Sequence, residues 1–110
     1  MEKIIGKWVQ KPGQPYEGLW FQFNSDGTFE AQYEPMGIVS SGTYMVEGTC
    51  ITLQQNAHTL GFVGEFKGLF EINIDELKMA LASAADQERP EDLQEARIYL
   101  KEQEEEEFYV

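Results

Sequence analysis

Apolar and polar residues alternate in short runs along most of the chain, and turn-forming residues separate these runs. The clearest run starts at Leu19, where every second residue as far as Phe23 is a large apolar one. A Ser-Asp-Gly turn follows at residues 25–27, where glycine can take a positive φ, and the alternation resumes over residues 29–33. Because successive side chains of a strand point to opposite faces, this region is predicted to be a β-hairpin with one apolar face.

A second feature is a pattern that occurs twice. The stretch GTYMVEGTCITL, residues 42–53, aligns without gaps with GLFEINIDELKM, residues 68–79. The matched pairs are Gly42 with Gly68, Tyr44 with Phe70, Val46 with Ile72, Ile51 with Leu77, and Leu53 with Met79. In each copy the aromatic and the branched residue share one face of a strand, and the two aliphatic residues lie on the returning strand. Two more hairpins are predicted; chance agreement between alternating strands is the alternative explanation, and it predicts hairpins as well.

The turns of these two hairpins are expected to differ. Glu47-Gly48 suits a tight turn, whereas Ile74 stands in the second copy, and a β-branched residue resists a positive φ. Between the copies, residues 54–61 are predicted to be a polar connection, and residues 62–66 a short strand that a glycine interrupts.

The last element has two interpretations. Residues 86–92 contain a proline and read as a loop, and the segment after it, residues 93–101, has apolar positions that fit either a helical stripe or an alternating strand. We predict a strand, because a meander of hairpins leaves two unpaired edges and a closing strand removes both. The total is about eight short strands, which predicts an all-β, antiparallel up-and-down barrel over residues 1–103, followed by an acidic tail at residues 104–110.

Composition and charge limit the kinds of partner that the chain is expected to bind. A chain of 110 residues with a net charge of -12 is one domain that repels phosphate backbones and anionic lipid, so neither nucleic acid nor a membrane is expected as a partner. The single Cys50 fits a reducing compartment, and Met1 leads directly into patterned sequence without a signal peptide. The expectation is a cytoplasmic protein, with the removal of a leader left open.

Catalytic chemistry finds little support in the residues. His58 is the only histidine, it lies in a polar stretch, and no nucleophile or carboxylate is spaced to orient it. Cys50 alternates with Ile51 and Leu53, so it is expected on the face opposite the core. One cysteine and one histidine do not make a zinc site, and the glutamate-rich run at residues 102–107 lacks the glycine turn of a calcium loop. No enzyme activity, metal or cofactor is predicted.

Gly6-Lys7-Trp8, followed by a meander of hairpins, resembles the lipocalin-like (calycin) set of small bacterial β-barrels. The motifs GTY, GLFEINIDELKMALA and ERP in the later part resemble a group of uncharacterised bacterial domains in that set. The resemblance implies a lipocalin-like barrel in which Trp8 packs across the closed end, beneath a basic residue of the last strand. Arg97 is the only arginine in that predicted strand, and an exposed strand charge is the alternative for it.

The aromatic residues decide the functional hypothesis. If the aromatic residues of the three hairpins point inward they fill most of a small barrel, so a pocket is expected to be small and close to one open end. The residues expected to contact a ligand are Trp20, Tyr33, Tyr44, Phe70 and Tyr99. The hypothesis is a non-enzymatic binding module for a small apolar or amphipathic molecule. The alternative is an interaction domain without such a ligand, in which Trp20, other exposed aromatics and the acidic C-terminus contact another chain or a second copy in a homodimer.

Overall fold

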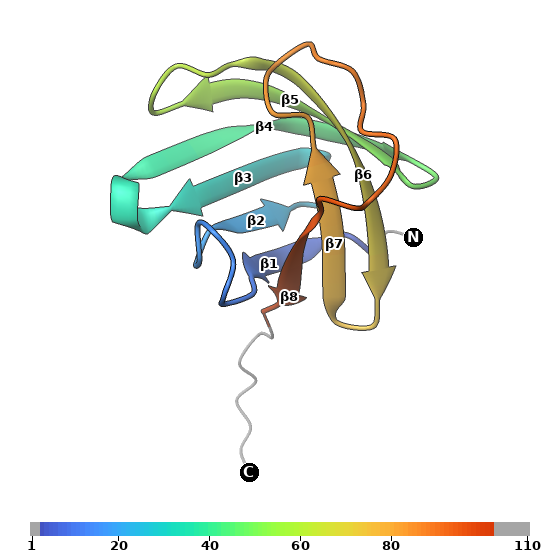
Figure 1. Ribbon diagram of the computed structural model, residues 1–110. Helices are drawn as coiled ribbons and strands as arrows, with labels where there is room; N and C mark the ends of the chain where they lie inside the picture. The colour runs from blue at the N-terminus through green and yellow to red at the C-terminus, as the bar shows by residue number, and fades with distance from the viewer. Residues whose placement is uncertain (1–2, 103–110) are drawn as a thin grey trace.

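The computed structural model describes residues 3–102, and these form a closed barrel of eight antiparallel strands (Figure 1). In chain order they are β1 Gly6–Gln10, β2 Trp20–Phe23, β3 Thr28–Tyr33, β4 Ile38–Glu47, β5 Cys50–His58, β6 Gly64–Asn73, β7 Glu76–Leu81 and β8 Arg97–Lys101, with a short 3-10 turn, η1 Glu34–Met36, before β4. Each strand pairs with the next, and β8 pairs with β1. The predicted all-β up-and-down barrel is confirmed, and the predicted acidic tail lies outside the described residues.

The first predicted hairpin is confirmed residue by residue. Phe23 pairs with Phe29 across β2 and β3, and Gly27 in the connecting turn has a φ of +88°. Phe21 pairs with Ala31, and all four of these side chains are buried inside the barrel. The alternation therefore places one face of the hairpin in the core, as the sequence predicts.

The internal repeat corresponds to two hairpins, β4 with β5 and β6 with β7. Tyr44 lies opposite Leu53, and Phe70 lies opposite Met79. A Cβ atom on the first glycine of the repeat, Gly42, would overlap the backbone of the neighbouring strand β5, and one on its equivalent in the second copy would overlap the backbone of β7. The repeated glycine thus marks the position in each hairpin where two backbones come too close for a side chain.

The prediction that the two turns differ is wrong. Glu47 pairs with Cys50 and Asn73 pairs with Glu76, so each turn has two residues, and the first of them has a positive φ in both copies, +63° at Gly48 and +55° at Ile74. The register leaves too few residues for any wider turn, so the tight turn imposes the left-handed conformation on isoleucine. The amide of Lys101 donates to the carbonyl of Asp75 and holds this turn against β8.

Three predicted boundaries are corrected. Strand β5 continues through His58, into the predicted polar connection, because it stays paired with the long strand β4. The predicted short strand at residues 62–66 and the first strand of the second repeat are one strand, β6. Of residues 93–101, only the last five form β8, which confirms a strand, while residues 93–96 belong to the preceding loop.

One end of the barrel, here called the closed end, is packed around Trp8. The indole is fully buried, its Nε1 donates to the carbonyl of Ile4 at 2.8 Å, and Lys101 Nζ lies 5.4 Å from the ring. The basic residue above the tryptophan is therefore Lys101, and the expectation of Arg97 is wrong. The reason is the register, since Trp8 pairs with Lys101 across β1 and β8 while Arg97 begins β8 at the opposite end.

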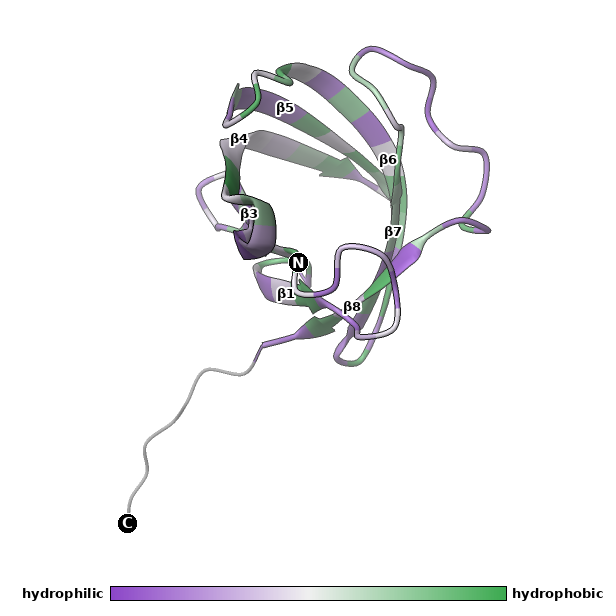
Figure 2. Cartoon of the chain, turned by 60° about the vertical axis from the view of Figure 1, so that its left-hand side comes forward, coloured by the Kyte–Doolittle hydropathy of each residue, from purple (hydrophilic) through white to green (hydrophobic). Residues whose placement is uncertain are grey.

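A long loop, residues 82–96, joins β7 to β8 and lies outside the barrel beside β6 and β7 (Figure 2). Arg89 pins it there. Its Nη1 donates to the carbonyls of Ile51 at 2.9 Å and Gly68 at 2.8 Å, and its Nη2 donates to Thr52 Oγ1 at 3.2 Å. One guanidinium thus holds the loop against two neighbouring strands, β5 and β6.

Candidate functional site

The end of the barrel opposite Trp8, here called the mouth, contains a hollow of about 240 Å³ between β2, β3, β4 and β5. Its walls are mostly apolar, with a few polar side chains between them. The apolar residues are Leu19, Phe21, Ala31, Tyr33 and Ile38, and the polar ones include Ser40, Gln55 and His58. Phe21, Ala31 and Ser40 are buried, so they form the floor of the mouth, above the packed core.

A second hollow, of about 440 Å³, adjoins the first and shares Gln55 and His58 with it. Phe62 and Phe66 from the β5–β6 region line its apolar side, and Ala85 from the start of the long loop lines the other. The amide of Asp86 donates to the carbonyl of Glu65 at 2.7 Å, so this part of the loop continues the wall of the barrel beyond β7. The two hollows together follow the inner side of the tall wall that β4, β5 and β6 make.

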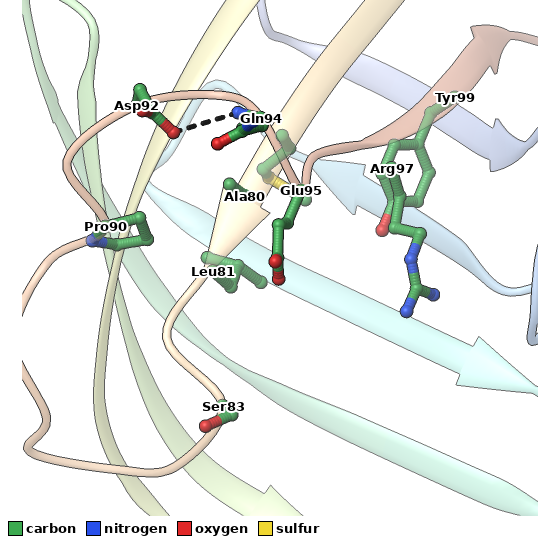
Figure 3. A pocket seen from close by; sticks show the side chains of 10 residues that line it. Ala80, Leu81, Ser83, Pro90, Asp92, Gln94, Glu95, Arg97 and Tyr99 are labelled. Carbon is green, nitrogen blue, oxygen red and sulfur yellow. Dashed lines mark hydrogen bonds between the residues drawn. The ribbon is translucent and has the colours of Figure 1, made fainter.

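A third hollow, of about 510 Å³, lies at the seam where β7 and β8 separate (Figure 3). The last pair between these strands is Met79 with Arg97, and beyond it Leu81 and Glu95 line opposite sides of the gap. Ser83 lines both this hollow and the second one. The three hollows therefore form a connected set around the mouth.

His58 lies between the first two hollows. Its Nδ1 accepts a hydrogen bond from the amide of Leu60 at 3.0 Å, and its ring centroid is 5.2 Å from that of Phe62. Because Nδ1 is the acceptor, the neutral ring carries its hydrogen on Nε2, which makes no hydrogen bond within residues 3–102. The imidazole thus offers one polar donor next to apolar surface.

Tyr99 and Arg97 extend to the same side of β8 at the seam (Figure 3). Burial raises the pKa of Tyr99 to about 12, and the positive charge of Arg97 opposes this shift. The Tyr99 hydroxyl makes no hydrogen bond to the described part of the chain. Arg97 has no carboxylate within 4.0 Å in residues 3–102, and its guanidinium lies 5.7 Å from the ring of Tyr16. A neutral phenol and an arginine without a carboxylate partner therefore line the seam.

The five residues that the sequence singled out lie in different places. Tyr33 lines the mouth and Tyr99 the seam. Tyr44 and Phe70 line a hollow of about 660 Å³ at the closed end, where the Tyr44 hydroxyl donates to the carbonyl of Asn24 at 2.9 Å. Trp20 faces outward on β2, with Lys7 Nζ 4.3 Å from its ring. The structure brings Tyr33 and Tyr99 to the same end of the barrel and leaves the other three apart.

Sequence reasoning missed the polar residues of the mouth, Ser40, Gln55 and His58. A β-bulge between Ser41 and Gly42 shifts the pairing of β4 with β5, so that Ser40 lies opposite His58. A shift of one residue exchanges the two faces of a strand, and it turns His58 toward the interior. Gly42 lies next to this bulge, but its equivalent Gly68 pairs with β7 without one, so the shared glycine does not predict the bulge.

Residues 3–102 contain no cluster of metal-binding side chains and no membrane-spanning helix. No three His, Cys, Asp or Glu side chains of residues 3–102 lie close enough together to hold a metal ion. None of these residues forms a helix of the length and apolar character that crossing a bilayer requires. Comparisons with protein-family models, curated proteins and solved structures find no match for this chain.

Proposed function

We propose that this chain is a lipocalin-like, non-enzymatic binding module that takes up one small amphipathic molecule at the mouth. The supporting observation is that half-buried apolar side chains at the mouth border two hollows that share the polar residues Gln55 and His58, above a packed middle level of the barrel. Six apolar side chains at the other levels of the barrel, Trp8, Phe23, Phe29, Ile51, Leu53 and Leu77, are no more than 2% exposed. The ligand covers the apolar side chains at the mouth, as the chain's own side chains cover these six.

The size and lining of the mouth fit this class of ligand. Pockets for small molecules are about 300–1,000 Å³ in volume, mostly apolar, with a few polar groups that orient the ligand. The second hollow, at about 440 Å³, falls in this range, and the first adds apolar wall beside it. Gln55 and His58, which both hollows share, would hydrogen-bond a polar head group while the apolar part lies over Phe21 and Phe66.

A thermal-shift series with straight-chain 1-alkanols of increasing length tests the proposal. Binding of an alkanol at 100 times its Kd raises the free energy of unfolding by about 2.7 kcal/mol, which moves the Tm of a domain of this size by roughly ten degrees. The shift should rise with chain length until the hollow is full and then stop rising. The absence of a shift with every alkanol would contradict the proposal.

A matched pair of variants locates the binding site. Ala31→Phe fills the floor of the mouth and should abolish the alkanol shift, whereas Ala57→Phe adds the same ring at an exposed position of β5 and should leave it unchanged. Ala31→Leu adds a smaller group and serves if the phenylalanine variant does not fold. Equal binding by the Ala31 and Ala57 variants would place the ligand elsewhere.

A further inference from the structure

Charge is distributed unevenly along the chain. Residues 35–64 contain one charged residue, Glu47, of the 28 Asp, Glu, Lys and Arg residues in the whole sequence. The other 80 positions hold the remaining 27 and nearly all of the net charge of -12. A stretch of 30 residues with a single charge is therefore an exception in a strongly acidic chain.

This stretch folds into one wall of the barrel, made of η1, the β4–β5 hairpin and the β5–β6 loop (Figure 1). The side chains of this wall that point away from the interior are here called the neutral face. It includes Val39, Ser41, Thr43 and Met45 on β4, together with the exposed Met36 and Leu60 at its end. The hydrogen bonds between Val39 and Thr59 join the β4 part of the face to the loop part.

Large apolar side chains are concentrated on this wall. Seven of the ten large hydrophobic residues that are exposed in residues 3–102 belong to residues 35–64, and four of these, Met36, Val39, Met45 and Leu60, line none of the hollows described above. Val39 is 52% exposed and Met45 is 71% exposed, and both lie on the outer side of β4. Scattered apolar side chains on a surface are ordinary, but a contiguous uncharged set marks an interaction surface.

Charged residues border the neutral face on both sides. Glu30 is exposed on β3, next to β4. On the other side, the long loop that Arg89 pins over β5 and β6 carries Asp86, Glu88 and Glu91. A partner that covers the face therefore meets an apolar centre inside a largely acidic border.

We propose that the neutral face is the contact between two copies of this chain in an isologous dimer. Two copies with a charge of -12 repel each other, and contacts through most other surfaces would place carboxylates opposite carboxylates. The neutral face meets its own copy with one charge on each side, Glu47, which follows Met45 on the outer side of β4 at the end of the strand. A two-fold axis through β4 would pack the two outer faces sheet on sheet and cover Val39 and Met45 of both copies.

Sedimentation equilibrium over a range of protein concentrations, at low and at high salt, tests this proposal. We expect a reversible dimer that becomes tighter as salt rises, because salt screens the repulsion between the two acidic chains and leaves the apolar contact intact. A dimer held by ion pairs between charged surfaces would become weaker in salt, and that result would overturn the proposal. So would a monomer at every attainable concentration.

Two double variants with equal charge identify the contact. Val39→Glu with Met45→Glu places carboxylates opposite each other in the dimer and should weaken association by about 100-fold or more. Ile74→Glu with Leu100→Glu adds the same charge at exposed apolar residues outside the neutral face and should weaken it far less. Equal weakening by the two pairs would overturn the proposal, and a circular dichroism spectrum and Tm for each variant confirm that both are folded.

Discussion

The two ends of the barrel have the same strands but use them differently. At the closed end, Trp8 is fully buried and Tyr44 borders a hollow, and the polar atoms of both have partners within the chain, the carbonyls of Ile4 and Asn24. At the mouth, the hydroxyl of Tyr99 has no partner in residues 3–102. Both ends therefore border a hollow, and the comparison teaches that they differ in their polar atoms: a hydroxyl without a partner in residues 3–102 lies on the side of the mouth, where a ligand that brings a polar group is expected.

Strand length explains this difference. Strands β4, β5 and β6 have 10, 9 and 10 residues, whereas β1, β2 and β8 have 5, 4 and 5. A barrel with walls of unequal height cannot oppose every inward side chain of the tall wall with one from the short wall. The side chains at the top of the tall wall then line a hollow, and those at the level of all eight strands form the core.

The largest expected effect is on the free energy of unfolding when phenylalanine is replaced by alanine at the packed level and at the mouth. Phe23→Ala at the packed level removes a fully buried ring and should lower the free energy of unfolding by about 3–5 kcal/mol. Phe66→Ala, at the half-buried wall of the mouth, should cost about half as much, because the ring already lies beside a hollow. Urea denaturation of both variants measures the difference, and equal costs would show that the mouth is packed like the core.

The pH dependence of stability should identify Tyr99. Its pKa in the folded chain is about 12, above the usual phenol value of 10.0 that applies after unfolding, so the folded chain favours the neutral hydroxyl. This contribution is present in full below pH 10 and is lost as the pH rises from 10 to 12, with a total of about 3 kcal/mol at most. Tyr99→Phe should remove that part of the decline in Tm measured over this range, and an unchanged decline would contradict the burial of the hydroxyl.

Much of the barrel could be predicted from the sequence because its signals are local. The alternation around Phe23, the turn glycine Gly27 and the repeated pattern each depend on residues within about a dozen positions. The bulge next to Gly42 and the loop pinned by Arg89 could not be predicted in this way. The acceptors of Arg89 lie 21 to 38 residues away in the sequence, and local patterns do not describe such contacts.

The candidate site was less predictable than the fold, because the sequence does not show how far along the barrel axis each inward side chain lies. The alternation shows that Tyr44 and Phe70 are on the inner face, but only the register shows at which end of a long strand they lie. Of the five residues expected to contact a ligand near an open end, only Tyr33 and Tyr99 line the hollows of the mouth and its seam. His58 was missed because the bulge reverses the face on which it lies.

A smaller difference in stability is expected between removing a polar atom that has a hydrogen-bond partner and removing one that has none. Trp8→Phe should destabilise the closed end by about 1–3 kcal/mol, because the buried carbonyl of Ile4 loses its donor. Tyr99→Phe at pH 7 should change stability by less than about 0.5 kcal/mol, since its hydroxyl has no hydrogen bond to lose. A large cost for Tyr99→Phe in urea denaturation would mean that the seam is already satisfied and has no polar group to offer a ligand.

The smallest effect concerns the strained turn that faces away from the mouth. Ile74 has a φ of +55° and is 91% exposed, so its side chain contributes no packing that offsets the strain of the left-handed conformation. Ile74→Gly should raise the free energy of unfolding by up to about 1 kcal/mol, because glycine relieves the strain and loses some of that gain to its greater entropy in the unfolded chain. Gly48→Ile makes the reverse change in the equivalent turn of the first repeat and should destabilise by a similar amount. If Ile74→Gly destabilises instead, the entropy that glycine adds to the unfolded chain outweighs the strain of the left-handed isoleucine.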